Sequence, residues 1–278
     1  MLKKAADAFI DEATLTREWQ RLNFLSIPEL EGAIIQYEAF ENIVIRAGAN
    51  PIYLPGDPAL SIDSLYCRDA SIVTNYGVVL GNMGKENRKG EPAAEGEVFS
   101  KNGIKILGAI TAPGTLEGGD CAWIAENTLA VGHTYRTNED GIRQLRSLLE
   151  PRGIEVLVAP MPHYRGPSDV FHLMSVFSPI DKDLAVVYSP LMPISFRNEL
   201  LRRNYTFVEV PESEFDSMGC NVLALAPRVC IVVKGNPETK SRLERAGCKV
   251  IEYEGSEISV KGGGGPTCLT RPVERFVD

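Results

Sequence analysis

The sequence predicts an α/β protein in which a ββαβ unit is repeated about five times to form a propeller-like ring. The first observation is a set of polar residues that open similar stretches of chain at intervals of 51, 52, 49 and 47 residues: Asp69, Asp120, His172, Asn221 and Cys268. The second is the content of the first four stretches, each with two apolar runs around a turn, a helical pattern and a third apolar run. A repeat of this period favours one closed array, so we expect a single domain over residues 1–278.

The elements follow in order along the chain. Residues 1–26 have a helical pattern, with Thr14 or Thr16 as the candidate cap. The repeats begin near Leu65, and SIVTNYGVVLGNM then reads as two short strands joined by a turn at Tyr76–Gly77. Later stretches read as a helix end, a turn and a strand, and three of these turns hold a glycine: Gly103, Gly153 and Gly247.

Two further stretches bear on the site. Residues 84–97, GKENRKGEPAAEGE, are polar and rich in glycine, so we interpret them as a surface loop that could act as a flap. The fifth unit begins at GGGGPTC near the C-terminus and needs N-terminal residues to complete it. Closure of the array would therefore bring the two ends of the chain together.

Composition and charge narrow the class of protein. An apolar content of 44% and a charged content of 24% are typical of a globular protein with a sizeable core. The net charge of −8, without a large basic cluster, argues against nucleic acid or an anionic membrane as a partner. No apolar run is long enough to span a bilayer, and the N-terminus lacks the apolar core of a secretory signal, so we expect a cytoplasmic protein. The six cysteines have no CxxC spacing, so we expect them to be reduced thiols. The sequence leaves open whether the protein is a monomer or a homo-oligomer.

The residues that open the units would converge on the axis of the ring and include groups that carry chemistry. Cys268 follows four glycines, whose amides can surround a thiol, although the same loop could be flexible and its cysteine incidental. His172 precedes an apolar run and is either an acid–base group or a structural residue. Glu117 and Asp120 in TLEGGD and Asp69 in YCRD are either turn caps or carboxylates that face a planar cation.

Taken in order, RD, EGGD, HLMS and GGGGPTC resemble the motifs of the guanidine-modifying enzymes with the pentein fold. That family comprises dimethylargininases, arginine deiminases, arginine dihydrolases and amidinotransferases, and the resemblance covers about residues 36–275. It implies an α/β propeller of five ββαβ modules around a pseudo-fivefold axis. It also implies a small guanidino compound as the partner, with no metal and no other cofactor.

The resemblance assigns roles to individual residues. Cys268 matches the nucleophile, His172 the general acid and base, and Glu117 the second acid near the histidine. Asp69 matches a carboxylate that binds the guanidinium.

Four more positions receive roles in the same way. Arg88 and Arg136 match arginines that bind the substrate α-carboxylate. Asp120 and Asn221 open their repeats, and we expect structural roles for them at strand starts and loops.

Two positions bear on the choice of reaction. Met174 stands where deiminases and amidinotransferases usually carry an aspartate, and HLMS is nearer to the His-Leu-Lys-Ser of dimethylargininases. Asn75 follows the RD motif by a few residues, as in arginine dihydrolases, and either positions a ureido intermediate or lies at a hairpin turn. We therefore expect a cysteine-dependent hydrolase of arginine or an Nω-substituted arginine that yields ornithine or citrulline. The alternatives are amidino transfer, a non-catalytic binding ring and a thiol redox protein.

Overall fold

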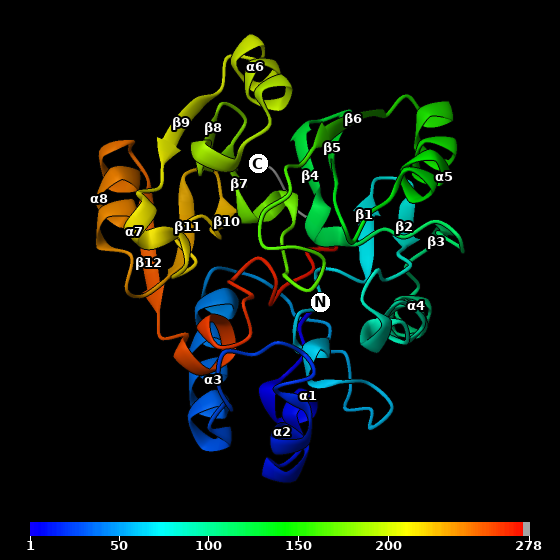
Figure 1. The fold of residues 1–278 in the computed structure, drawn as a ribbon, viewed down its shortest axis with the longest axis vertical. Helices are drawn as coiled ribbons and strands as arrows, with labels where there is room; N and C mark the ends of the chain where they lie inside the picture. The colour runs from blue at the N-terminus through cyan, green and yellow to red at the C-terminus, as the bar shows by residue number, and fades with distance from the viewer. Residues whose placement is uncertain (275–278) are drawn as a thin grey trace.

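The computed structural model describes residues 1–274 and contains four three-stranded sheets, each formed by one ββαβ unit (Figure 1). The units stand around a common centre that holds the C-terminal loop, drawn in red. Residues 275–278, the end of the predicted domain, lie outside the described residues. The elements of the four units are, in chain order, β1 (Ser71–Thr74), β2 (Gly77–Leu80), α4 (Glu91–Lys101) and β3 (Ile106–Ala109); β4 (Cys121–Ala125), β5 (Thr128–His133), α5 (Glu139–Leu149) and β6 (Glu155–Pro160); β7 (Phe177–Asp181), β8 (Leu184–Val187), α6 (Ile194–Arg202) and β9 (Thr206–Glu209); and β10 (Leu223–Ala226), β11 (Val229–Val233), α8 (Pro237–Arg245) and β12 (Lys249–Tyr253).

Every sheet has the same topology. The first two strands form an antiparallel hairpin, and the third pairs parallel to the second. A parallel pair needs a crossover connection, which the helix of each unit provides. The middle strands are buried on both faces, as the four consecutive buried residues of β8 illustrate. Their continuous apolar runs are those from which the repeat was predicted.

The helices cover the sheets by apolar stripes. In α5, Ile142, Leu145 and Leu149 are buried and lie in one core cluster with Leu129 of β5 and Val156 of β6. Spacings of three and four residues place such side chains on one helix face. Within residues 1–274, no helix has the length and apolar content needed to cross a membrane.

The turns that follow the helices of the four units, and the turn after the N-terminal helix α3, have the same backbone conformation. Gly103, Gly153 and Gly247 have φ of 69°, 78° and 82°, so all three predicted turn glycines occupy the left-handed region. The third unit places Asn204 there, with φ of 63°. Gly48, after the N-terminal helix α3 (Leu30–Arg46), has φ of 94°. Glycine adopts this region without penalty and asparagine tolerates it, so the helix ends share one cap geometry.

Residues 1–26, which were predicted to be helical, contain two short helices, α1 (Ala5–Phe9) and α2 (Glu12–Glu18), and α3 lies beyond this stretch. Ile10, with φ of 64°, separates the first two. The cap of α2 is Asp11, whose carboxylate accepts the backbone N–H of Thr14 at 2.7 Å. The prediction of Thr14 or Thr16 as the cap is therefore wrong, because aspartate one turn earlier satisfies the free N–H groups.

The two ends of the described chain meet, as the repeat predicted. Leu2 forms an isolated parallel bridge with Tyr53, and its backbone N–H donates to the carbonyl of Ile52 at 2.9 Å. On the other side, the N–H of Arg271 donates to the carbonyl of Met1 at 3.0 Å. Residues 1–274 contain no fifth three-stranded sheet, and where the chain ends meet there is the single bridge between Leu2 and Tyr53.

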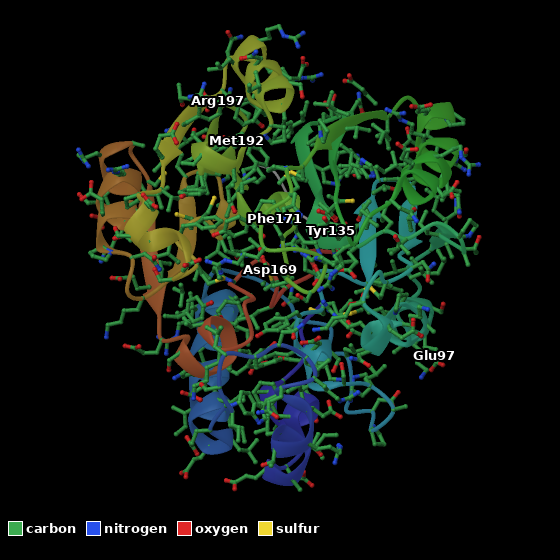
Figure 2. All side chains as sticks on the ribbon, in the orientation of Figure 1. Glu97, Tyr135, Asp169, Phe171, Met192 and Arg197 are labelled. Atoms are coloured by element: carbon green, nitrogen blue, oxygen red, sulfur yellow. The ribbon has the colours of Figure 1, made fainter. Side chains whose placement is uncertain are left out.

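The segment 84–97 differs from the predicted surface loop. Its second half begins α4, and Glu91 and Glu95 are buried there, whereas Glu97 lies at the edge of the molecule in Figure 2. Proline at the second position suits the first turn of a helix, so the Gly-Glu-Pro sequence that resembled a loop is a helix start. The buried acids have partners in the chain, since Ser71 Oγ donates to Glu95 at 2.6 Å. An irregular segment, residues 161–172, lies between β6 and the turn Leu173–Ser175.

Candidate active site

Four of the five residues that open the units, all except Asp120, line one cavity of about 280 Å³. Segment 161–172 forms part of its wall, and Figure 2 places Asp169 and Phe171 of this segment near the centre. Met174 adds an apolar side chain to the wall. Six of the predicted site residues also line the cavity: Asp69, Arg88, Arg136, His172, Asn221 and Cys268.

His172 and Glu117 form a buried ion pair at this cavity. His172 Nε2 lies 2.7 Å from Glu117 Oε2, and both side chains are almost inaccessible to solvent. Burial opposes the charged imidazolium, but the carboxylates of Asp120, Asp69 and Glu117 outweigh it and raise the pKa of His172 to about 9. Burial likewise opposes the charged form of Glu117, yet His172, Arg136 and Arg88 lower the pKa of Glu117 to about 2. At neutral pH the pair is therefore an imidazolium and a carboxylate.

Asp69 presents one unsatisfied oxygen to the site. Its Oδ2 accepts from Arg88 Nη1 at 2.6 Å, and its Oδ1 has no hydrogen-bond partner among residues 1–274. This Oδ1 lies 3.9 Å from His172 Nδ1. A buried carboxylate oxygen without a donor is costly, so an incoming N–H group would be stabilised there.

Arg88 lies against Asp69, not free in the cavity. Its Nε and Nη2 donate to the two carboxylate oxygens of Glu91 at 2.9 and 2.7 Å, and Nη2 also donates to the carbonyl of Tyr66 at 2.9 Å. With Nη1 bonded to Asp69, these contacts occupy most of the guanidinium donors. The geometry thus makes Arg88 a support of Asp69, which differs from the expected contact with a substrate carboxylate.

Arg136 has the freer guanidinium. Its Nη1 lies 3.5 Å from Glu117 Oε1, and its side chain forms no other hydrogen bond to the described residues. The residue is held by its backbone N–H, which donates to Thr134 Oγ1 at 3.0 Å. The geometry therefore leaves Arg136 with donors for a carboxylate in the cavity.

Cys268 is half-buried, and its thiol is held by the loop that precedes it. Asn221 Nδ2 donates to the sulfur at 3.3 Å, while Asn221 Oδ1 accepts from the backbone N–H and hydroxyl of Thr267 at 3.0 and 2.8 Å. A Cβ at Gly265 would overlap the Asn221 side chain, so this glycine permits the contact. Asn221 thus touches the sulfur, which is more than the structural role expected for it. Burial, followed by the charge of Asp69, raises the pKa of the Cys268 thiol.

Asp120 and Gly119 place His172. Asp120 Oδ1 accepts from the backbone N–H of Leu173 at 2.9 Å, and its Oδ2 accepts from Thr134 Oγ1 at 2.7 Å. A Cβ at Gly119 would overlap His172 Nδ1 and crowd Asp69 Oδ1, so only glycine leaves room for the two groups. The structural role predicted for Asp120 agrees with these bonds, which fix the backbone next to the histidine.

Asn75 lies outside the site. It is exposed at the turn between β1 and β2 and is absent from the cavity wall. The turn lies at the end of β1 opposite to Asp69, which precedes the strand. The expectation that Asn75 contacts substrate is therefore corrected, and its alternative interpretation as a turn residue describes its place.

Lys85 and Asp63 are site residues that the sequence did not indicate. Lys85 Nζ donates to Asp63 Oδ2 at 2.6 Å and to the carbonyl of Leu22 at 2.8 Å, and all three residues line the cavity. No motif marks either position, since Lys85 falls in the segment interpreted as a flap.

Two carboxylates and the histidine of the site are also residue types that could bind a metal cation. Ligand atoms of Asp69, Glu117 and His172 all lie within 4.8 Å of one another. Here the positive charges of protonated His172 and Arg88 already balance the two carboxylates. A divalent cation would therefore compete with the proton on the imidazole.

Comparison with known proteins places the chain in a family. A sequence model described as "N,N dimethylarginine dimethylhydrolase, eukaryotic" matches residues 18–275. The chain belongs to this family. It is a member of the guanidine-modifying hydrolases of the pentein type, as the motifs had predicted.

Individual relatives agree with the family match. The uncharacterized protein YkgA of Bacillus subtilis is 30% identical over 77% of this chain and 70% of its own length. The N(G),N(G)-dimethylarginine dimethylaminohydrolase of Pseudomonas aeruginosa is 26% identical over 88% and 90% of the two chains. A structure of that enzyme, a cysteine-to-serine variant in complex with citrulline, has a TM-score of 0.74 and covers 88% of this chain and 89% of its own.

A further structure supports the fold alone. The N-terminal domain of the cyanobacterial arginine dihydrolase ArgZ is 20% identical, has a TM-score of 0.81 and covers 98% of this chain and 96% of its own. The described fold is thus of the mixed α/β type shared by these enzymes.

Proposed function

We propose that the protein hydrolyses a carbon–nitrogen bond in the guanidinium group of arginine or an Nω-substituted arginine through a covalent adduct on Cys268. The observation that carries this proposal is the convergence on one cavity of a thiol, a protonated histidine and an unsatisfied carboxylate oxygen. Complexes of relatives point to the same chemistry, since the Pseudomonas aeruginosa enzyme binds citrulline, a ureido compound.

Substrate binding would prepare the thiol. The guanidinium would donate to Asp69 Oδ1, which has no partner among the described residues, while Arg136 receives the substrate carboxylate. Placing a cation beside Cys268 offsets the burial that raises the pKa of its thiol, so the thiol releases its proton to solvent and the thiolate forms once substrate is bound. The Asn221 amide, 3.3 Å from the sulfur, orients it and stabilises its negative charge.

In the first half of the reaction, the Cys268 thiolate forms a bond with the guanidinium carbon and gives a neutral tetrahedral adduct. His172, charged through its pair with Glu117, donates a proton to one nitrogen of this adduct. The carbon–nitrogen bond then breaks, ammonia or an amine leaves, and a thiouronium remains on the sulfur.

In the second half, the now neutral His172 removes a proton from water, and the resulting hydroxide attacks the thiouronium carbon. The carbon–sulfur bond breaks, Cys268 leaves as the thiolate, and the ureido product departs after losing a proton. The net reaction consumes one water and gives one ureido group and one ammonium or alkylammonium ion. Glu117 keeps the imidazole in position through both proton transfers.

The position of Asn75 favours one round of hydrolysis. The dihydrolase interpretation, with ornithine as the product, relied on Asn75 beside the ureido intermediate, and this residue is exposed on a hairpin outside the cavity. Citrulline from arginine or from dimethylarginine is thus the proposed product. Transfer to an amine acceptor stays the alternative, because the same thiouronium could react with an amine in place of water.

We also propose that a fifth ββαβ module closes the ring. It would consist of the segment that follows Cys268, residues 1–3, helix α3 and residues 52–54. The hydrogen bonds from Arg271 to Met1 and between Leu2 and residues 52 and 54 support this arrangement. The left-handed Gly48 after α3, which matches the other helix ends, also supports it.

A product assay tests the proposed function. The protein is incubated separately with L-arginine, Nω,Nω-dimethyl-L-arginine and L-citrulline, and the products are identified by mass spectrometry. We expect citrulline with ammonia or dimethylamine, and no consumption of citrulline. Ornithine from citrulline would contradict the single hydrolysis, and turnover of neither arginine would contradict the proposed function.

A further inference from the structure

One wall of the cavity contains a set of oxygen acceptors that bind an ammonium group, and this ammonium belongs to the side chain of Lys85. Lys85 Nζ donates to Asp63 Oδ2 at 2.6 Å and to the Leu22 carbonyl at 2.8 Å. The side chains of Lys85 and Asp63 are 15% and 5% exposed, so the ion pair is largely removed from solvent. Its acceptors come from positions 41 residues apart in the chain, which shows that the fold assembles them around one cation.

This site lies beside the proposed substrate-binding groups. The backbone N–H of Lys85 donates to Glu117 Oε1 at 3.1 Å, and Arg136 approaches the same oxygen at 3.5 Å. The other oxygen of Glu117 is bonded to His172. The backbone of Lys85 and the guanidinium of Arg136 therefore both contact the Glu117 oxygen that is not bonded to His172.

Charge at this end of the cavity favours an anion and disfavours an ammonium. Lys85 and Arg136 bring two positive charges, and the carboxylates beside them are already paired, that of Asp63 with Lys85 and that of Glu117 with His172 and Arg136. A substrate ammonium that sought Asp63 or the Leu22 carbonyl would have to displace Lys85 or lie beside it. An ammonium beside Lys85 would be repelled by it, because like charges repel each other far more strongly in a buried site than in water.

We infer that Lys85 takes the place of a substrate α-ammonium group, and that the site prefers ω-guanidino carboxylic acids without a free α-amine over arginine itself. This inference rests on the proposed hydrolysis of a guanidinium and narrows its substrate class. The substrate carboxylate is held by Arg136, with Lys85 adding to the positive charge that attracts it. Arginine binds through its guanidinium and carboxylate, with a penalty for its ammonium.

Another carboxylate at the cavity defines the rival arrangement. Asp169, on segment 161–172, is partly exposed and lines the cavity, so it could receive an α-ammonium without disturbing Lys85. The neighbouring carboxylate of Asp216 already accepts two hydrogen bonds from Arg165, at 2.9 and 3.0 Å. The experiment must therefore separate Lys85 from Asp169.

The test uses two ligands that differ only in the α-amine, L-arginine and 5-guanidinopentanoate. Their binding to the Cys268→Ser variant, in which turnover cannot interfere, is measured by calorimetry. We expect 5-guanidinopentanoate to bind about tenfold more tightly than arginine. In Lys85→Met and Lys85→Gln on the same background, the preference should fall or reverse, because Asp63 and the Leu22 carbonyl become free for the ammonium.

Two controls complete the test. Lys240→Met removes a lysine that is paired with the carboxylate of Glu252 and does not line the cavity, and should keep the tenfold preference. Tighter binding of arginine to the protein with Lys85 intact, abolished by Asp169→Asn, would overturn the inference. So would a preference of the same size with and without the lysine side chain at position 85, or the absence of binding by both ligands.

Turnover separates this inference from the proposed function. Values of kcat/KM for the two compounds are measured on the protein with Cys268 intact, with detection of ammonia. If both are hydrolysed and arginine is the better substrate, the inference fails while the hydrolase function stands. If neither is hydrolysed but 5-guanidinopentanoate still binds more tightly through Lys85, the hydrolase function fails and the binding preference stands.

Discussion

At the scale of single residues, the site is a set of buried charges that stabilise one another. Asp120, Asp69 and Glu117 hold a proton on His172. Arg88 occupies one oxygen of Asp69, and the other has no partner among the described residues. The histidine is thus charged before any substrate arrives. The thiol of Cys268 is neutral, because burial and Asp69 raise its pKa. The proposed reaction needs these two protonation states. His172 must carry the proton that it donates to the leaving nitrogen, and the Cys268 thiolate must form beside the guanidinium that it attacks.

The requirement for a protonated His172 predicts that activity falls at high pH. The pKa of His172 is raised from 6.5 to about 9, so the imidazolium persists through neutral pH and is lost as pH rises through about 9. Protonation of the leaving nitrogen requires that form. We expect kcat, measured at saturating arginine or dimethylarginine where the thiolate has already formed, to fall tenfold per pH unit above about pH 9. A profile that stays flat to about pH 10.5 would count against His172 as the acid.

The variant Glu117→Gln provides the matched control for this prediction. It keeps the size of the side chain but removes a charge that raises the pKa of His172, so the descending limb should shift to lower pH. The His172 imidazole pKa, read from its proton resonances in NMR spectra, should shift in the same direction. An unchanged pKa would show that Asp120 and Asp69 alone account for the shift.

The pKa shifts of His172 and Glu117 also make the stability of the fold depend on pH. For His172, whose pKa is raised on folding, the stabilising contribution is complete below pH 6.5 and is lost as pH rises through about 9. For Glu117, whose pKa is lowered from 4.5 to about 2, the contribution is complete above pH 4.5 and is lost as pH falls through about 2. The pair therefore stabilises the fold between these limits.

At the scale of elements, one ββαβ pattern is repeated with one geometry at each helix end. Gly103, Gly153 and Gly247 could be predicted because glycine is the residue that a left-handed turn demands. Asn204 could not, because asparagine occurs in many other turns as well. The start of α4 was missed for a similar reason, since the glycines and proline of 84–97 are as frequent in loops as at helix starts.

The helix ends give a stability prediction. Gly153 has φ of 78° and no atom within 4 Å of where a Cβ would lie, so Gly153→Ala adds backbone strain without a clash. We expect a loss of about 1 kcal/mol in the free energy of unfolding, measured by urea denaturation. The control is Asn204→Gly at the equivalent turn, which should change stability by less than about 0.5 kcal/mol because the left-handed conformation is kept. Equal losses in both variants would contradict a shared turn geometry.

At the scale of the whole molecule, the repeat brings residues more than a hundred positions apart into one cavity. The period of the sequence predicted this convergence, and six of the nine residues named from the motifs line the cavity. What it could not predict was how each charge is used. Arg88 supports Asp69, and Lys85 pairs with Asp63, through contacts that depend on side-chain direction within the fold. Asn75, close in sequence to Asp69, lies outside the cavity wall, and the strand β1 separates the two residues.

Closure of the ring gives a prediction at this scale. The N–H of Leu54 donates to the carbonyl of Leu2 at 2.8 Å, and that of Arg271 donates to Met1 at 3.0 Å. If these contacts belong to a fifth module, the two amides should exchange with deuterium as slowly as those of the β4–β5 hairpin. Hydrogen exchange measured by NMR decides the matter. Exchange at the rate of an unprotected loop would contradict closure by the chain ends.

The central claim, a guanidinium hydrolase that works through Cys268, is tested most directly by trapping the adduct. The protein is mixed with dimethylarginine or arginine, quenched in acid during turnover, digested and mapped by mass spectrometry. We predict a thiouronium on the peptide that contains Cys268, absent from the Cys268→Ser variant, which should form no product. Continued product formation by that variant, or turnover of the native protein without any adduct on Cys268, would contradict the account.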